Sequence, residues 1–280
     1  MFGVTLNTRR VLEDAIKELD PRAAQVLKSR YGLYGEDVKT LSSLGSSYGL
    51  TRERIRQIEE SSLEVLRGHI DEEEATAILE VVNEYLNHLG NLRRARELVR
   101  DLRIISRVKY DEDTFGSELR LLAKVMGEPY IVTSDNHFHD VWHNDKEAYK
   151  LASLISDNLR KFKEHDFDKF MATVIKKFEL SEIIIINYLS ISKHFDVGPY
   201  GELGADHWPH IQPKTVKDKS FLVLKKAKTP LHFKEIADLV NKLSKKKVHP
   251  ATTVHNELIK DSRFILVDRG TYALKDHLKN

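Results

Sequence analysis

The chain has 280 residues, of which 41% are hydrophobic and 31% are charged, and it contains no cysteine. This length fits two to four domains, and the hydrophobic content is sufficient for packed cores. The lack of cysteine excludes disulfides, thiolate nucleophiles and zinc sites with sulfur ligands. No apolar run approaches the roughly 20 residues that span a bilayer, and the first residues lack the pattern of a signal peptide. We therefore expect a cytoplasmic protein without membrane contact.

The formal net charge of +2 is distributed unevenly along the chain. Residues 1–68 carry 11 Lys and Arg against 10 Asp and Glu, residues 69–212 carry 18 against 26, and residues 213–280 carry 16 against 7. We expect the basic last segment to attract phosphate groups. The acidic middle segment favours structural or protein contacts, because nucleic acid would repel it.

The first predicted motif is a pair of helices joined by a glycine turn. Residues 40–49 predict a short helix that ends at Gly49, and residues 52–67 predict a longer helix with Thr51 as its N-cap. One stripe of the longer helix is suited to a core-facing surface: Ile55, Ile58, Ser62, Leu63 and Leu66. This pattern predicts a helix-turn-helix.

A second face of the longer helix carries Arg52, Glu53, Arg56 and Gln57 over its first two turns. In a helix-turn-helix, the N-terminal residues of the second helix meet base edges in the major groove. Arginine can bond guanine, glutamine can bond adenine, and glutamate can accept a hydrogen bond from cytosine. These side chains are candidate base readers, although an arginine-rich face can equally be a solvated surface.

Residues 19–33 ("LDPRAAQVLKSRYGL") and 40–67 ("TLSSLGSSYGLTRERIRQIEESSLEVLR") resemble region 4 of housekeeping-type bacterial sigma factors. That region recognises the promoter −35 element and grips the flap of RNA polymerase. The resemblance implies a DNA-binding set of six residues: Thr51, Arg52, Glu53, Arg54, Arg56 and Gln57. Within it, Thr51 and Arg54 would support the approach to the DNA backbone.

The sequence departs from this family after residue 59, where a basic tail usually follows. Glu60 and Glu64 stand in that tail and should weaken the attraction to phosphate groups. The aromatic-rich, promoter-melting region of sigma factors is not seen before Leu19. We therefore do not expect a complete sigma factor.

The last segment predicts three helices, over residues 215–226, 233–243 and 251–260, and a hairpin of residues 263–267 and 271–274. This order is that of a winged helix. The stretches "PLHFKEIADLV", "TTVHNELIKDSRFILV" and "GTYAL" resemble the HARE-type winged-helix family, which includes the N-terminal domain of the delta subunit of bacterial RNA polymerase. Six lysines are candidates for phosphate contact or are merely solubilising: Lys225, Lys226, Lys228, Lys245, Lys246 and Lys247.

A similar order of helix, strand, turn and strand occurs twice in the middle of the chain. Trp142, Trp208 and Tyr272 are separated by 66 and 64 residues, and each would close a wing. Helices are predicted before the two middle wings over residues 75–89, 92–102, 146–162 and 167–178. We therefore predict a mainly α protein with a sigma region 4-like helix-turn-helix, two tandem winged-helix-like units with small hairpin wings and a HARE-type winged helix, over residues 1–68, 69–143, 144–212 and 213–280.

His137, His139 and His143 lie near Asp140, but the pattern does not complete a metal coordination shell. We expect no metal, no cofactor and no enzymatic activity. The leading hypothesis is a DNA-binding transcription regulator that engages double-stranded promoter DNA of the −35 type, the RNA polymerase flap, or both. An alternative is a polymerase accessory subunit or sigma competitor that does not read DNA. A third is the DNA-targeting module of a defence or modification system, because HARE-type domains also occur fused to nucleases.

Overall fold

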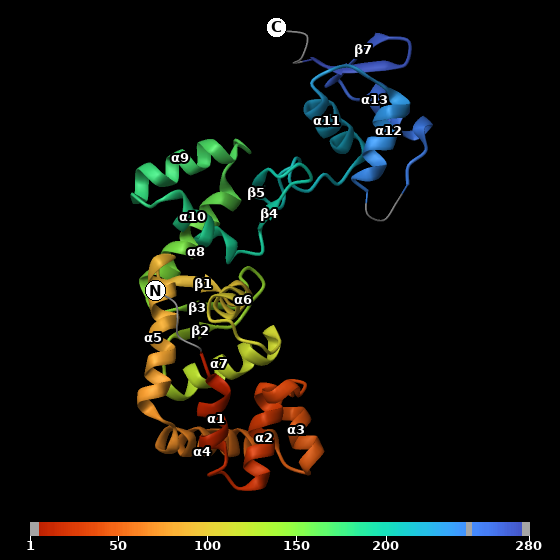
Figure 1. Ribbon diagram of the computed structural model, residues 1–280. Helices are drawn as coiled ribbons and strands as arrows, with labels where there is room; N and C mark the ends of the chain where they lie inside the picture. The colour runs from red at the N-terminus through yellow and green to blue at the C-terminus, as the bar shows by residue number, and fades with distance from the viewer. Residues whose placement is uncertain (1–5, 245–247, 276–280) are drawn as a thin grey trace. The chain divides into compact units, whose positions relative to one another are not determined.

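The computed structural model describes residues 6–244 and 248–275, and most of them lie in α-helices (Figure 1). The chain forms two compact units. Unit 1 includes residues up to Ser156 together with Val174–Lys193, and unit 2 includes Asp157–Thr173 together with residues from His194 onward. Across the described ranges, no helix combines the length and the apolar character needed to cross a membrane. The predicted mainly α class is confirmed.

Unit 1 begins with a group of short helices. In chain order they are α1 (Thr8–Ile16), α2 (Pro21–Tyr31), the 3-10 helix η1 (Leu33–Gly35), α3 (Leu41–Tyr48) and α4 (Arg52–His69). The ends of α2 follow from local sequence. The Asp20 carboxylate accepts hydrogen bonds from the first free backbone amides, Pro21 occupies the first helical position, and Gly32 ends the helix at φ 68°.

The next part of unit 1 has the element order of a winged helix. It consists of α5 (Glu72–His88), β1 (Leu92–Arg94), α6 (Ala95–Ile105), α7 (Glu112–Met126), β2 (Tyr130–Val132) and β3 (Val141–His143). The three strands are antiparallel in the order β1-β3-β2. The helix expected over residues 92–102 begins only at Ala95, because the three residues before it pair with β3.

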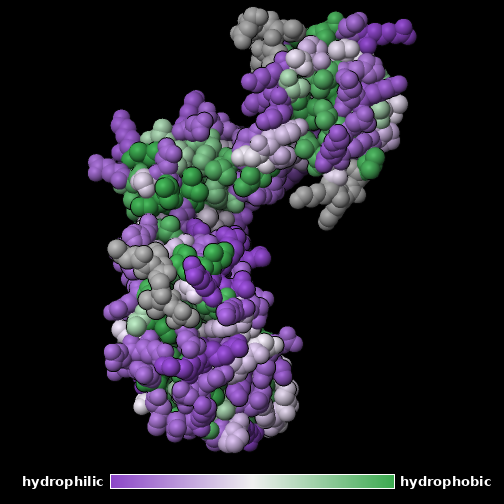
Figure 2. Space-filling view, viewed as in Figure 1, coloured by the Kyte–Doolittle hydropathy of each residue, from purple (hydrophilic) through white to green (hydrophobic). Residues whose placement is uncertain are grey.

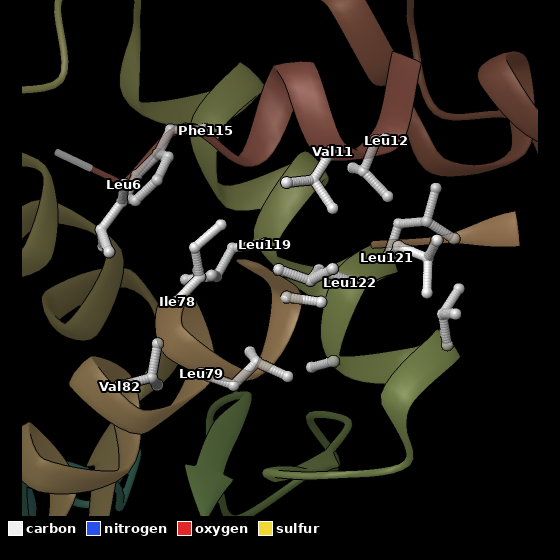
Figure 3. Close-up of a cluster of buried hydrophobic side chains, with 14 of the residues drawn as sticks. Leu6, Val11, Leu12, Ile78, Leu79, Val82, Phe115, Leu119, Leu121 and Leu122 are labelled. Carbon is white, nitrogen blue, oxygen red and sulfur yellow. The ribbon is translucent and has the colours of Figure 1, made fainter. Parts of the chain in front are cut away.

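One hydrophobic core joins these two parts of unit 1. Buried side chains of α1, α5 and α7 lie together in it, among them Leu12, Ile78, Leu119 and Leu122 (Figure 3). In Figure 1, α7 lies beside α1, consistent with the contacts between these helices. Leu63 and Leu66 of α4 enter the same core, so the apolar sides of α4 and α7 stabilise each other. The predicted division of the chain into four segments stays a prediction.

A buried carboxylate reinforces the junction between α1 and α7. Glu118 is fully buried on α7 and accepts hydrogen bonds from the Thr8 hydroxyl (2.9 Å), Arg9 Nε (2.9 Å) and the Tyr110 hydroxyl (2.7 Å). Burial raises the pKa of Tyr110 far above its ordinary value, so the phenol stays a donor. A buried charge is tolerated here because its oxygens are satisfied.

The following elements are α8 (Lys146–Lys161), α9 (Phe167–Phe178), α10 (Glu182–Ser190), β4 (Phe195–Val197) and β5 (Leu203–Ala205). The two strands form an antiparallel hairpin, as expected for a wing. Trp208 lies beyond the end of β5, and its side chain is buried. Helix α10 belongs to unit 1, where the Asn187 side chain donates hydrogen bonds to the carbonyl oxygens of Leu89 and Leu92, both at 2.8 Å.

The C-terminal part of unit 2 consists of α11 (Val216–Ala227), β6 (Leu231–His232), α12 (Phe233–Lys242), α13 (Ala251–Lys260), β7 (Phe264–Asp268) and β8 (Thr271–Leu274). Its antiparallel strands have the order β6-β8-β7, which is the order of the three-stranded sheet in unit 1. Val223, Ile236, Val254 and Tyr272 are part of its core. The predicted helices and hairpin are present, and β6 is an additional strand.

Candidate nucleic-acid interface

The turn between α3 and α4 is built as the sequence predicts. The Thr51 hydroxyl accepts a hydrogen bond from the backbone N–H of Arg54 at 3.1 Å, and Gly49 ends α3 at φ 64°. Gly45 lets the two helices approach closely, because a Cβ at this position would lie 2.7 Å from the carbonyl oxygen of Leu50. These features confirm Thr51 as the N-cap of the second helix.

A small core fixes α2, α3 and α4 against one another. It contains Val26, Leu44 and Ile55, all of them buried. The predicted core-facing stripe of α4 is confirmed, since Ser62, Leu63 and Leu66 are buried in addition to Ile55, while Ile58 is half-buried. This end of unit 1 has a mostly hydrophilic surface in the space-filling view (Figure 2).

The opposite face of α4 presents the predicted DNA-binding residues over its first two turns. Arg52, Glu53, Arg54 and Gln57 are exposed, and Arg56 is half-buried. The capped helix therefore brings the predicted base readers together on one accessible surface. Whether they contact DNA stays a prediction.

Most side chains of this face are bonded to one another. Arg56 donates from Nε and Nη2 to the Glu53 carboxylate, at 2.9 and 2.7 Å, and from Nη1 to Glu60. Arg54 donates from Nη1 to Oε1 of Gln57 at 3.0 Å. Among the described residues, no hydrogen bond or ion pair holds the exposed Arg52. The sequence predicted the reading face but not these pairs, although the spacings of three and four residues are those at which helical side chains meet.

The paired groups remain charged. The hydrogen bond from Arg56 lowers the pKa of the Glu53 carboxyl below its ordinary value, and the same bond raises the pKa of the Arg56 guanidinium. The face thus carries alternating positive and negative groups at neutral pH. A DNA duplex approaching α4 would meet an arginine, Arg56, that already has carboxylate partners.

The C-terminal half of α4 is used differently from the first half. Leu63 and Leu66 enter the large core that α4 shares with α7, and Arg67 donates from Nε to the carbonyl oxygen of Val125 at 2.9 Å. Glu64 remains exposed. The absence of the basic tail in the sequence was the available signal that this half of the helix serves another purpose.

The third helix of each winged-helix-like segment in unit 1 is also occupied. Helix α7 holds this position in the first segment, and its apolar side chains are buried against α1, α2 and α4. Helix α10 holds it in the second, and the Tyr188 hydroxyl donates a hydrogen bond to the carbonyl oxygen of Gly90 at 2.8 Å, beside the bonds of Asn187. The predicted middle wings therefore accompany helices whose packing surfaces are used within the chain.

The third helix of the C-terminal winged helix has an exposed face, which the sequence analysis did not single out. Its exposed residues on α13 are Thr252, Thr253, Asn256, Ile259 and Lys260. Hydroxyl and amide groups can bond base edges, and a branched apolar side chain can contact the thymine methyl group. The equivalence in element order and strand order between this domain and the first winged-helix-like segment was the signal that could have identified α13.

The predicted lysines lie away from α13 in the sequence. Lys225 and Lys226 are exposed in the last turn of α11, and Lys228 caps the helix at φ 58°. Cations in this position also interact favourably with the negative end of the helix dipole. Lys245, Lys246 and Lys247 lie outside the described residues. Phosphate contact by either group stays a prediction.

The histidines near Asp140 form no metal site in the part of the chain that the structure describes, where no group of three or more His, Asp or Glu residues could hold an ion. Instead, the Asp140 carboxylate accepts hydrogen bonds from the backbone N–H of Ser134 and from Arg120. Burial lowers the pKa values of His139 and His143, which favours their neutral forms. The expectations of no metal, no cofactor and no enzymatic activity stay predictions.

Comparison with known families identifies two segments of the chain as helix-turn-helix domains. Residues 15–68 match the family model for sigma-70, region 4. Residues 214–277 match the model for the HARE-HTH family, a helix-turn-helix domain whose description names ASXL and restriction endonucleases. Both resemblances seen in the sequence are confirmed.

Individual relatives match the first of these segments. The RNA polymerase principal sigma factor HrdD of Streptomyces coelicolor is 48% identical over 60 residues, which are 21% of this chain and 18% of the relative. The RNA polymerase sigma factor SigA of Microcystis aeruginosa is 48% identical over 59 residues, or 21% of this chain and 14% of the relative. The chain thus spans less than a fifth of the length of these relatives.

Proposed function

We propose that the protein is a DNA-binding transcription regulator whose sigma region 4-like module engages promoter DNA of the −35 type. The observation that carries this proposal is the position of the reading residues. Arg52, Arg56 and Gln57 lie on an accessible face of a capped helix, in the segment that matches sigma-70 region 4. In a helix-turn-helix this part of the second helix enters the major groove.

The C-terminal winged helix would supply a second contact to DNA or polymerase. Its segment carries 16 Lys and Arg against 7 Asp and Glu, and α13 presents a face with hydrogen-bonding side chains. Two weak modules on one chain raise each other's effective concentration at a shared target. The two winged-helix-like segments between them would act as a spacer, because their third helices pack within unit 1.

The test is selection of bound duplexes from a random DNA pool by the full-length protein at two salt concentrations. We expect enrichment of a −35-like motif. Replacing Arg56 or Gln57 by alanine should cost roughly 1–3 kcal/mol of binding free energy per lost base contact and relax the preference at that base. Lys150→Ala is a matched control, since Lys150 is an exposed cation paired with a carboxylate three residues earlier, as Arg56 is. Equal binding of every duplex by wild type and Arg56→Ala would refute direct reading.

A second candidate function is that of an RNA polymerase accessory subunit or sigma competitor without direct DNA reading. The pairing of Arg56 with two carboxylates favours it, as does the excess of acidic residues over residues 69–212. Under this alternative, purified RNA polymerase should retain the wild-type chain and the Arg56→Ala variant equally. Failure of polymerase to retain the wild-type chain would exclude it.

A further inference from the structure

Both sides of the Arg56 guanidinium are occupied by carboxylates of its own helix. Glu53, three residues earlier, receives hydrogen bonds from Nε and Nη2, and Glu60, four residues later, receives one from Nη1. All three side chains are substantially exposed, with 43% exposure for Arg56 and 58% for each glutamate. The pairs can therefore exchange with solvent or with a ligand at little cost.

The two carboxylates have different consequences for base reading. Arginine recognises guanine through two N–H donors that reach O6 and N7 together. Glu53 holds Arg56 through two adjacent donors and so fixes the orientation of the guanidinium plane. Glu60 covers the remaining terminal nitrogen, Nη1. A guanine that needs both terminal nitrogens must displace Glu60.

We propose that Glu60 is a built-in competitor that lowers the affinity of Arg56 for DNA, and that Glu53 is the positioning residue for the same side chain. The inference rests on the proposed function, because it concerns the strength of DNA reading by α4. It assigns to Glu60 a specific action on one reader. A general reduction of positive charge along the helix would be a different effect.

Glu64 makes it possible to separate these two effects. It lies on the same helix four residues beyond Glu60, is exposed, and forms no hydrogen bond or ion pair with Arg56 among the described contacts. Glu60→Gln and Glu64→Gln remove the same charge and keep nearly the same shape. Only the first frees Nη1 of Arg56.

The experiment measures binding of the full-length variants to the duplex recovered by selection, and to a duplex of the same composition in scrambled order. Each substitution is made in the wild-type and the Arg56→Ala background, and circular dichroism checks that helix content is unchanged. We expect Glu60→Gln to tighten binding to the selected duplex roughly three- to tenfold, and Glu64→Gln to change it less than about twofold. The gain from Glu60→Gln should disappear in the Arg56→Ala background.

Equal gains from the two glutamine variants would overturn the proposal, because charge alone would then explain them. A gain from Glu60→Gln that persists without Arg56 would overturn it as well. Failure of the proposed function gives a different result: if selection recovers no duplex and a mixed-sequence duplex is bound equally with and without Arg56, base reading by α4 is absent and the competitor role is excluded with it.

Discussion

Arg67 donates a hydrogen bond from Nε to the carbonyl oxygen of Val125 at 2.9 Å, so the end of α4 is tied to the last turn of α7. Replacing Arg67 by alanine should lower the free energy of unfolding by about 1–2 kcal/mol, because a charge-assisted bond is lost. Urea denaturation of the full chain measures this change. The neighbouring Glu64→Ala serves as the control, and we expect less than about 0.5 kcal/mol for it. An equal loss for both variants would contradict a role of the Arg67 bond.

The two glycines Gly45 and Gly68 should respond to alanine in opposite directions. A Cβ on Gly45 would lie 2.7 Å from the backbone oxygen of Leu50, whereas a Cβ on Gly68 would meet nothing within 4 Å. Gly45→Ala should destabilise the protein by about 1–3 kcal/mol through overpacking. Gly68→Ala should stabilise it by up to about 1 kcal/mol, because alanine is the better helix former. Thermal unfolding of the two variants tests the pair, and a shift of the same sign for both would argue against the close approach of α3 and α4.

The shared core predicts a large effect of a substitution outside the matched sigma-like segment. Leu119 is fully buried on α7, whereas Leu154 on α8 is 47% exposed. Leu119→Ala should cost about 2–5 kcal/mol of unfolding free energy, and Leu154→Ala should cost well under that amount. Hydrogen exchange should show that Leu119→Ala also lowers the protection of α4. If α4 kept its wild-type protection, the two parts of unit 1 would be energetically independent.

His143 should make the stability of unit 1 sensitive to mild acid. The side chain is buried between the rings of Tyr130 and Tyr149, at 5.4 and 5.6 Å, and burial lowers its pKa below the ordinary 6.5. The unfolded chain therefore binds a proton more readily, and stability should fall as the pH drops below 6.5 toward the lowered pKa. His143→Phe keeps the ring and removes the titration. Denaturation at pH 7 and pH 5 should show a smaller loss for this variant, and an unchanged loss would assign the acid sensitivity elsewhere.

The helix-turn-helix could be predicted because its signals are local. Thr51 and Gly49 are adjacent to the residues that they cap, and the stripe from Ile55 to Leu66 repeats at helical spacing. The first residues of the helix expected from Leu92 were assigned incorrectly, since they form a strand only because β3 pairs with them about 50 residues later in the chain. No local pattern carries that information.

The candidate site was predictable to a similar extent. The face with Arg52, Arg56 and Gln57 follows from helical periodicity alone. The pairing of Arg56 with Glu53 and Glu60 depends on side-chain rotamers, and the alternative of solvated side chains fits the same spacing. The role of α7 was the largest omission, because its apolar stripe suits any core, and only the fold shows that the core includes α4.

The sequential docking of third helices within unit 1 limits how this chain could be recombined. The matched sigma-like segment ends at residue 68, but the side chains that close its apolar surface come from α7, more than 40 residues later. A graft that moved only the matched segment into another protein would leave that surface open to solvent, so α7 would have to be moved with it. Likewise, the loop after α5 would have to be moved together with α10, which satisfies its carbonyl groups. The modules resemble interchangeable parts, yet within unit 1 they are inherited as a set.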